Sequence, residues 1–310
     1  MASEWYLKAS GAWKQVNEAF YKTGGSWKEI QEAWIKVGGS WKQFYTAFVA
    51  TAFTDETSNT SVVVPTGANA IHVQAAVGGG AAGVSGAEYD KSGGESGGTG
   101  GGSGAYISDK VFSVTEGETL TLTVGVGGTN SQQGSYPNYS AEGGGNTVLL
   151  GSTTGSMFTL GGGGGGSSSG GSSPNGSVRT NLPSSGGSAT ISATPLTSGT
   201  FRESNGATVT FATATTLDQG PVGTFNQTGS GTAGTLGQNC TGDNCQITGQ
   251  TGASSYGGVY AGGNGNPAGG GGSGINGQKG SGGGGGGGQP QSVGGSGGTG
   301  QIKYRFLRIT

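Results

Sequence analysis

Three short stretches of the chain carry residue types that could perform chemistry. Residues 94–98, Gly-Glu-Ser-Gly-Gly, match the pattern in which a serine nucleophile lies on a sharp strand-to-helix turn. In that architecture the histidine follows the serine, whereas the single histidine of this chain, His72, precedes it within an alternating apolar stretch. We therefore predict no hydrolase site and interpret His72 as the outward-facing residue of a strand.

The other two stretches give no stronger signal. Residues 277–281, Gly-Gln-Lys-Gly-Ser, lack the Lys-Ser/Thr order of a phosphate-binding loop. The acidic residues Glu88, Asp90 and Glu95 do not have the spacing of an EF-hand, and solvated charge accounts for them. We expect a protein that is not an enzyme and that needs neither a cofactor nor a metal ion.

Two cysteines, Cys240 and Cys245, flank Thr-Gly-Asp-Asn in a glycine-rich stretch. Two thiols and one histidine cannot complete a four-ligand zinc site. A small disulfide that pins one loop and a pair of free thiols both remain open.

Composition limits the type of protein further. Of 310 residues 75 are glycine and only 30% are hydrophobic, so a conventional core cannot extend through the whole chain. The net charge is −2 and no basic stripe is present, which argues against a nucleic-acid partner. The first residues do not read as a signal peptide and no 18-residue apolar stretch follows. We expect no membrane insertion and synthesis in a bacterial cytoplasm followed by release on lysis.

An internal repeat of 14 residues occupies residues 7–48. Its three units are LKASGAWKQVNEAF, YKTGGSWKEIQEAW and IKVGGSWKQFYTAF. The pairs Gly24-Gly25 and Gly38-Gly39 lie between short alternating runs and predict two-residue hairpin turns with positive φ. A helix through Lys28 to Ala33 is the open alternative, and we expect a helical turn between the hairpins.

All five tryptophans lie in the first 41 residues. They form either the core of a minidomain or an interface, and the triple repeat favours an interface with a partner of three-fold symmetry. The sequence predicts an attachment module at residues 1–50 and a separate head at residues 51–310. The expected attachment residues are aromatic: Trp5, Trp13, Phe20, Trp27, Trp34, Trp41 and Phe48.

Alternating runs in the head predict half-buried strands. Residues 71–77, 120–126 and 302–306 alternate apolar with polar or small residues, and Glu116-Gly117-Glu118 suggests a hairpin turn between residues 111–114 and 119–126. Because the first and last of these runs are far apart in the sequence, we expect the glycine blocks between them to be insertions within one domain.

The glycine blocks, such as residues 161–166 and 282–288, have the composition of flexible linkers. Since they recur between strands, we predict instead a bundle of three-residue-per-turn polyglycine II helices joined by backbone hydrogen bonds. The expected fold is mainly β with polyglycine II helices: a small module of β-hairpins and helical turns, followed by a polyglycine-helix sandwich framed by strands.

Several motifs together resemble a known family. VVVPTGANAIHVQAAVGGG, GGSGAYISDKVFSVTEGETLTLTVGVGG, FTLGGGGGG and GGTGQIKYRF are similar to the glycine-rich domain of phage tail fibres. With the Trp-Lys repeats, the chain resembles the distal tip adhesins of T-even-like phage long tail fibres. The resemblance implies a polyglycine-helix sandwich with variable loops at one end that contact an outer-membrane protein or surface glycan.

Three loops have the composition of a contact surface: residues 130–142, 175–225 and 238–260. Tyrosine, phenylalanine and arginine provide large contact areas in such loops. The candidate contact residues are Tyr136, Tyr139, Arg179, Phe201, Arg202, Phe225, Tyr256 and Tyr260. Phe211 is a weaker candidate because alternation through Ala207 to Ala214 predicts a hairpin there.

These observations lead to the expectation of a receptor-binding adhesin at the distal tip of a phage tail fibre, one copy per trimeric fibre, that determines host range. An intracellular chaperone for fibre assembly is the alternative, and an ice-binding or coat protein is a third.

Overall fold

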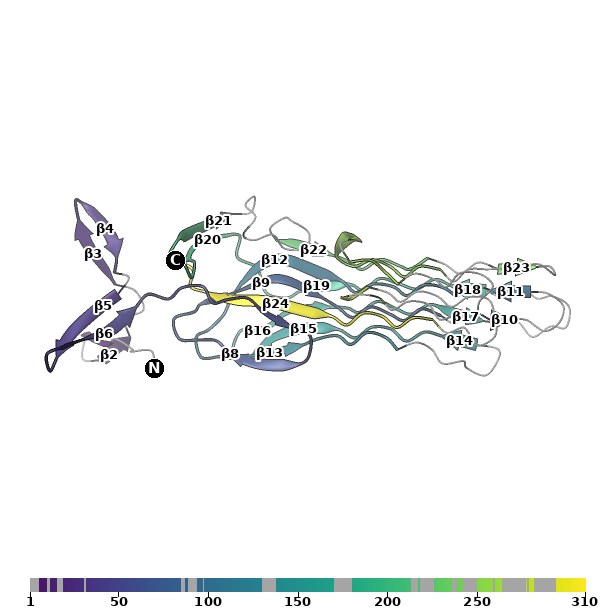
Figure 1. Cartoon of the computed structure of the whole chain (residues 1–310), viewed down its shortest axis with the longest axis horizontal. Helices are drawn as coiled ribbons and strands as arrows, with labels where there is room; N and C mark the ends of the chain where they lie inside the picture. The colour runs from purple at the N-terminus through teal and green to yellow at the C-terminus, as the bar shows by residue number, and fades with distance from the viewer. Residues whose placement is uncertain are drawn as a thin grey trace.

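The computed structural model describes residues 6–9, 12–15, 19–30, 32–84, 87–88, 94–96, 98–129, 138–169, 180–212, 217, 226–235, 239–241, 250–258, 260–263, 277, 279–281 and 294–310. Within these residues the regular elements are β-strands and one 3-10 turn, η1 (Tyr256–Gly258). The molecule is elongated, with hairpins at one end, two larger sheets beside them, and glycine-rich tracts leading to small sheets at the far end (Figure 1). The prediction of a mainly β fold is confirmed.

The Trp-rich repeat folds as three antiparallel hairpins. They are β1 (Tyr6–Ala9) with β2 (Ala12–Gln15), β3 (Phe20–Thr23) with β4 (Ser26–Glu29), and β5 (Glu32–Val37) with β6 (Ser40–Thr46). Gly24 and Gly25 have φ values of 56° and 82°, and Gly38 and Gly39 have 60° and 86°. Positive φ at both central positions is what a two-residue turn of this twist requires, so the predicted turns are confirmed.

The helical alternative for residues 28–33 is wrong, because β4 continues to Glu29 and β5 begins at Glu32. Between these hairpins the backbone N–H of Ile30 donates to the carbonyl of Ala19 at 2.6 Å. Neither of these two residues is helical, and the remaining residues of the predicted helical turn lie outside the described part of the chain.

Two open, five-stranded antiparallel sheets form the base of the head. The first has the order β22 (Gln227–Gly229), β12 (Tyr106–Ser113), β9 (Ala70–Val77), β24 (Gln301–Leu307), β7 (Thr54–Glu56). The second has the order β19 (Ala189–Ile191), β16 (Gly155–Leu160), β15 (Thr147–Gly151), β13 (Thr119–Thr123), β8 (Thr60–Val63). Because β9 pairs with β24, segments from the first and the last part of the head's sequence lie side by side in this sheet.

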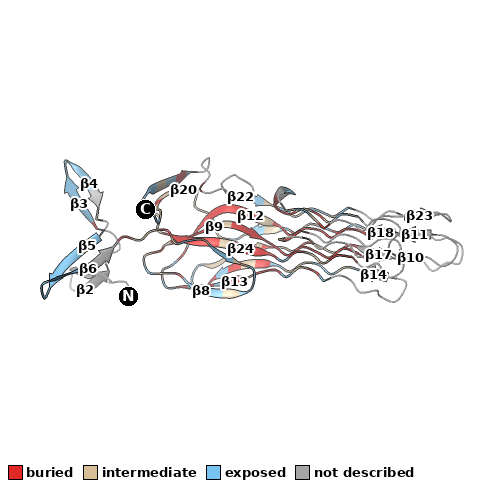
Figure 2. Ribbon diagram, viewed as in Figure 1, coloured by how far each residue is buried: buried red, intermediate tan, exposed pale blue. Residues whose placement is uncertain are grey.

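The main hydrophobic core lies between these sheets. Ile71, Phe112 and Ile302 of the first sheet share one buried cluster with Leu122 and Phe158 of the second. The rings of Phe112 and Phe158 lie 6.0 Å apart. Figure 2 shows this buried region in red between exposed hairpins and the tracts.

The predicted hairpin around Glu116–Glu118 is wrong. β12 belongs to the first sheet and β13 to the second, so this turn crosses from one sheet to the other. Glu118 fastens the crossing, because its carboxylate accepts hydrogen bonds from the backbone N–H groups of Thr115, Thr153 and Thr154. Burial alone would raise the pKa of Glu118, but these hydrogen bonds outweigh burial and lower the pKa below its ordinary value.

The predicted alternation along β9 also fails at one point. Ile71 and Val73 lie in the main core, whereas Ala75 and Val77 contact Tyr256 in a separate cluster. The pairing with β24 shifts register there, since Tyr304 pairs with Val73 but Lys303 pairs with Ala75. A bulge of this kind exchanges the two faces of a strand, which explains why Ala76 lies in the main core and Ala75 does not. β9 is buried on both sides because the second face is covered as well, by Tyr256 beside Ala75 and by Phe201 and Phe211 beside Ala70.

Eight strands of the two sheets continue directly into glycine-rich tracts. The tracts are residues 78–84 after β9, 98–105 before β12, 124–129 after β13, 141–146 before β15, 161–166 after β16, 183–188 before β19, 230–235 after β22 and 294–300 before β24. The sheets therefore set the position and direction of each tract.

Backbone hydrogen bonds join the tracts with a period of three residues. Along residues 78–84, successive N–H groups donate in turn to tracts 98–105, 141–146 and 294–300, at distances of 2.8 to 3.0 Å. The pairs to these tracts are Gly78 to Ala105, Ala81 to Gly102 and Val84 to Thr99; Gly79 to Gly145 and Ala82 to Glu142; Gly80 to Gly298 and Gly83 to Gly295. Hydrogen bonds to the same neighbouring tract thus recur every third residue, which is the period of polyglycine II helices, while the helices themselves stay a prediction.

Close approach of the tracts depends on missing side chains. A Cβ atom on Gly79 would lie 2.1 Å from the carbonyl oxygen of Val126, and one on Gly297 would lie 1.9 Å from that of Gly80. Both distances are far below van der Waals contact with a backbone atom that cannot swing away. Glycine is therefore required here for packing.

Small sheets complete the head. At the far end lie β10 (Ala87–Glu88), β11 (Gly94–Ser96) and β23 (Asn239–Thr241), and separately β14 (Asn138–Ser140), β17 (Ser167–Ser169) and β18 (Thr180–Leu182) (Figure 1). We call these six strands and their connections the tip. The predicted hairpin near Ala207 is confirmed as β20 (Ser198–Arg202) paired with β21 (Thr208–Ala212), and it lies at the base of the head beside the N-terminal hairpins.

Replacing Gly79 with alanine should cost about 3 kcal/mol of unfolding free energy or more, because the new methyl group meets the backbone of Val126. Gly143→Ala is the matched control, since its Cβ would have its closest neighbour at 3.1 Å. The control should change stability by less than about 1 kcal/mol. Equal losses in chemical denaturation of the two variants would contradict the close-packed bundle.

Replacing Glu118 with glutamine should cost about 2 kcal/mol at neutral pH, because three backbone donors lose a charged acceptor. The lowered pKa makes the contribution of Glu118 fully present above its ordinary value of 4.5 and lost as the pH falls through the lower folded value. The stability difference between the wild type and the variant should therefore shrink on acidification below pH 4.5. Glu116→Gln, which removes a carboxylate bound by one backbone N–H, is the control.

Candidate attachment and contact surfaces

The three hairpins present the repeat in equivalent register. Each places a lysine directly opposite a tryptophan, two residues from the turn. The pairs are Lys8 with Trp13, Lys22 with Trp27 and Lys36 with Trp41. In the second hairpin the Lys22 Nζ atom lies 5.8 Å from the centre of the Trp27 ring, so the cation stacks on the indole.

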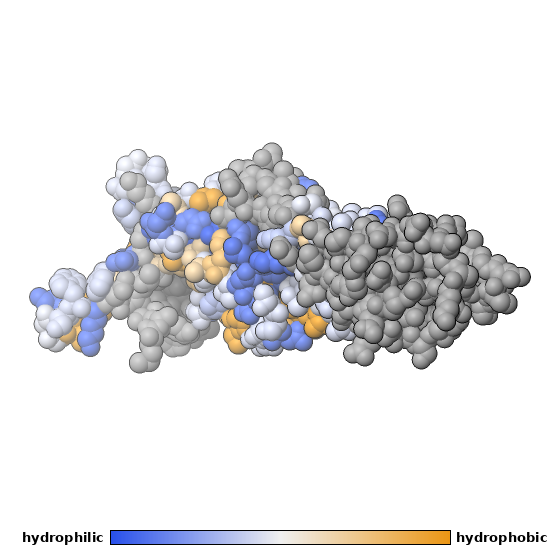
Figure 3. All heavy atoms as spheres, turned by 45° about the vertical axis from the view of Figure 1, so that its right-hand side comes forward, coloured by the Kyte–Doolittle hydropathy of each residue, from blue (hydrophilic) through white to orange (hydrophobic). Residues whose placement is uncertain are grey.

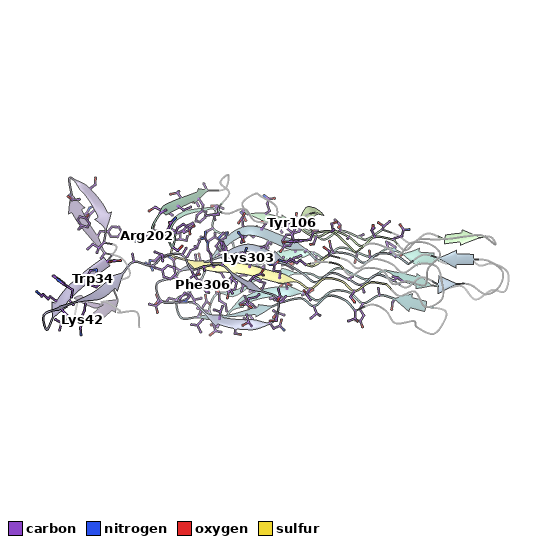
Figure 4. The ribbon with its side chains drawn as sticks, in the orientation of Figure 1. Trp34, Lys42, Tyr106, Arg202, Lys303 and Phe306 are labelled. Atoms are coloured by element: carbon purple, nitrogen blue, oxygen red, sulfur yellow. The ribbon has the colours of Figure 1, made fainter. Side chains whose placement is uncertain are left out.

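Four of the predicted attachment residues are exposed. Trp27 and Trp41 expose 67% and 65% of their surface, and Phe20 and Trp34 each expose 50%. Ala19 and Ala47 form the only small buried cluster that the described residues of the hairpins show. Trp34 and Lys42 project from the module in Figure 4. The side chains of Trp5 and Trp13 lie outside the described residues.

Phe48 belongs to the head, which corrects its assignment to the attachment surface. It packs against the main core, and its ring lies so close to Gly67 that a Cβ there would be 3.1 Å from it. At Phe48 the chain already runs beside the two sheets, so the apolar ring packs against the head.

The tip holds part of the predicted contact surface. Tyr139 lies in β14, opposite Ser168 of β17, and Cys240 lies in β23, opposite Glu95. Tyr136, Arg179, Phe225 and Cys245 lie outside the described residues, so the disulfide stays a prediction. Of the predicted contact loops, residues 130–142 thus place Tyr139 at the tip, and residues 175–225 place β18 there.

Arg202 lies at the opposite end from the tip (Figure 4), and Phe201 precedes it in β20. Phe201 is 3% exposed and packs beside Phe211 at 6.4 Å. The backbone carbonyl of Arg202 accepts a hydrogen bond from Ala50 at 2.6 Å. This corrects the assignment of Phe201 as a contact residue, because its side chain forms a second core beneath β20 and β21. Arg202 at the base is likewise separated from any tip surface.

A chain of polar and charged side chains fastens this hairpin to the first sheet. Glu203 pairs with Arg305 at 2.9 Å, and the Arg305 Nε atom lies 3.3 Å from His72 Nδ1. His72 Nε2 in turn lies 3.2 Å from Asp109 Oδ1. The guanidinium also stacks between Phe53 and Phe201, at 4.6 and 5.1 Å from their ring centres.

His72 is fully buried, so its prediction as an outward-facing residue is wrong. The physical reason is that β20 and β21 cover the face of β9 from which it projects. The alternation of residues within β9 does not indicate that this face is covered, because β20 and β21 come from a distant part of the sequence.

Tyr256 is 1% exposed, which corrects its assignment as a contact residue. It packs against Ala75 and Val77, while Tyr260 beside it remains partly exposed. Of the third predicted loop, 238–260, the described residues near Tyr256 therefore lie along the side of the head.

Ser96, considered as a nucleophile, is the last residue of β11 in a three-stranded sheet, where Glu95 lies opposite both Glu88 and Cys240. The single histidine, His72, lies in β9 of the first sheet. Among the described residues no group of three or more metal-ligating side chains is present, and no helix has the length and hydropathy to cross a membrane. On the face shown in Figure 3, the described residues are a mixture of hydrophilic residues and apolar patches.

The family model for the glycine-rich domain matches residues 54–307, from the first residue of β7 to the last of β24. The chain therefore belongs to the glycine-rich domain family. The match covers both sheets and all the tracts and leaves the three hairpins outside. A search of curated proteins finds no match. The resemblance to a glycine-rich domain is confirmed, and the link with phage fibres stays a prediction.

Replacing Trp27 and Trp41 together with serine should change the melting temperature by less than about 2 °C, because both indoles are largely exposed. Phe112→Ala, which empties a fully buried position, should in contrast cost about 3 to 5 kcal/mol. If the double variant lost as much stability as Phe112→Ala, the tryptophans would form a core instead of an interface.

Proposed function

We propose that the chain is a receptor-binding adhesin carried at the distal tip of a phage tail fibre. Its hairpins dock on the trimeric fibre, and its tip contacts an outer-membrane protein or surface glycan of the bacterium and so determines host range. It is made in the host cytoplasm, becomes part of the virion and performs no catalysis.

The observation that carries this proposal is the set of three hairpins in equivalent register. A partner with three-fold symmetry offers three identical surfaces, and one chain can match them only with three similar units of its own. Exposed tryptophans are typical anchors of such interfaces. Residues 7–48 also contain six lysines and three glutamates, which favours an acidic rim on the partner surface.

The arrangement along the molecule supports a division between attachment and recognition. The hairpins and the tip lie at opposite ends, separated by the two sheets and the tracts (Figure 1). A rigid scaffold that raises loops away from an anchor is the arrangement that recognition loops need.

The experiment is selective labelling of bacteria. A fluorescent fusion of the full chain is applied to a panel of strains, beside a variant in which residues 130–137 and 170–179 are replaced by Gly-Ser segments of equal length. We expect labelling of particular strains by the fusion and loss of that labelling in the variant, with an unchanged melting temperature. A control variant with Trp27→Ser and Trp41→Ser should keep its labelling, because those side chains lie at the other end.

Absence of labelling on every strain would contradict the adhesin. Antibody detection in purified particles then decides the chaperone alternative, since an assembly chaperone is absent from mature virions.

A further inference from the structure

Three tyrosine rings lie in a row on the side of the head, where the tracts begin, each tilted against the next. The ring centres of Tyr106 and Tyr256 lie 5.4 Å apart, and those of Tyr256 and Tyr260 lie 5.5 Å apart. Tyr256 is buried, whereas Tyr106 and Tyr260 are partly exposed. Figure 4 shows Tyr106 between the base and the tip, so this tyrosine cluster is distinct from both proposed surfaces.

A positively charged and a negatively charged side chain border the tyrosine cluster. The Lys279 Nζ atom lies 5.4 Å from the centre of the Tyr260 ring and 3.9 Å from Asp55 Oδ2. The other oxygen of Asp55 accepts a hydrogen bond of 2.6 Å from the Gln301 amide. Lys279 and Asp55 expose 41% and 43% of their side chains, so both can reach a ligand from solvent.

The backbone is strained at two of these positions. Tyr256 has a φ of 49° and Lys279 a φ of 28°, and they are two of the four described non-glycine residues with positive φ. Such conformations persist only when the surroundings hold them, and they gather at functional sites. Buried hydroxyl groups fix this part of the backbone: Ser255 donates to the carbonyl of the strained Lys279 at 2.8 Å, and Ser281 donates to the carbonyl of the neighbouring Tyr260 at 3.0 Å.

Two buried polar atoms of this region have no hydrogen-bond partner. Among the described residues, the buried side-chain atoms without a hydrogen-bond partner are the Tyr256 hydroxyl and the Gln301 Oε1 atom. The Gln301 side chain donates its amide N–H to Asp55, and burial, followed by the charges of Tyr260 and Asp55, raises the pKa of Tyr256. Buried polar groups normally find partners, and an unpaired one calls for an explanation.

We propose that the tyrosine cluster is a binding site for a neutral sugar. The apolar face of a pyranose ring stacks on Tyr260, and Asp55 accepts hydrogen bonds from the sugar hydroxyls. Lys279 covers the Tyr260 ring when no sugar is bound and swings aside on binding, since its contact with Asp55 is long and partly solvated.

The charges of the site select the class of ligand. An anionic ligand is repelled by Asp55 and a cationic ligand by Lys279, whereas the hydroxyl groups of a neutral sugar can pair with both. Aromatic surface with a few polar groups that fix orientation is the usual composition of a small-molecule site. The site goes beyond receptor contact by the tip and does not depend on the proposed function.

The test is saturation-transfer NMR of the full-length protein with a panel of D-glucose, D-galactose, D-mannose, L-rhamnose and N-acetyl-D-glucosamine. We expect transfer to at least one of these sugars, lost in Tyr260→Ala and retained in Tyr260→Phe, which keeps the stacking face. Asp55→Asn should weaken binding about tenfold through loss of a charged acceptor. Tyr21→Ala removes an exposed tyrosine of a hairpin and should change nothing.

Absence of transfer to every sugar of the panel overturns the proposal, as does equal transfer to a sugar from the wild type and from Tyr260→Ala. Because Asp55 is exposed, Asp55→Asn tests the site even where Tyr260→Ala does not fold. Strain labelling that depends on the tip would remain unaffected by either outcome, so failure of this site is distinguishable from failure of the adhesin.

Discussion

Contact between bare backbones is the constraint on which the rest of this structure depends. In the tracts, a Cβ atom on most glycines would lie within about 2 to 3 Å of a neighbouring carbonyl. The tracts can therefore hydrogen-bond on several sides at once, as residues 78–84 do with three neighbours in turn. Each such bond contributes only about 1 kcal/mol net, and glycine loses more conformational entropy on ordering than any other residue. Such a bundle is stable only when many tracts are ordered together.

The two sheets provide that simultaneous ordering. Eight tracts leave the sheets as direct continuations of strands, so the hydrophobic core that fixes the strands also fixes the spacing and direction of the tracts. The aliphatic and aromatic residues of this glycine-rich chain are accordingly concentrated in the two sheets, where they fix the direction of the tracts. At the base, the ion pair of Glu203 with Arg305 and the stacked Phe53 and Phe201 extend this fixed region to the junction with the hairpins.

The sequence predicted the elements that depend on local chemistry. The glycine pairs of the repeat specified two-residue turns, and recurring glycine blocks between strands indicated packed tracts. It did not predict relations set by distant segments. Nothing local shows that β12 and β13 lie in different sheets, that a bulge beside Gln74 exchanges the faces of β9, or that β20 and β21 bury His72. The candidate site residues show the same difference between local and distant relations. The exposed tryptophans follow from the repeat. Loop composition alone could not show that the aromatic rings of Phe201 and Tyr256 are buried.

A scaffold held by backbone groups separates folding from recognition. In a conventional core, side chains both stabilise the fold and restrict which substitutions a neighbouring loop tolerates. Here the cohesion of the tracts is independent of side-chain identity wherever glycine is kept, and the tip strands are joined to the sheets through those tracts. Substitutions in the tip can therefore change its surface without disturbing the interactions that keep it in place. For the proposed adhesin, this separation would allow receptor contacts to change while the hairpins and their three-fold register stay constant.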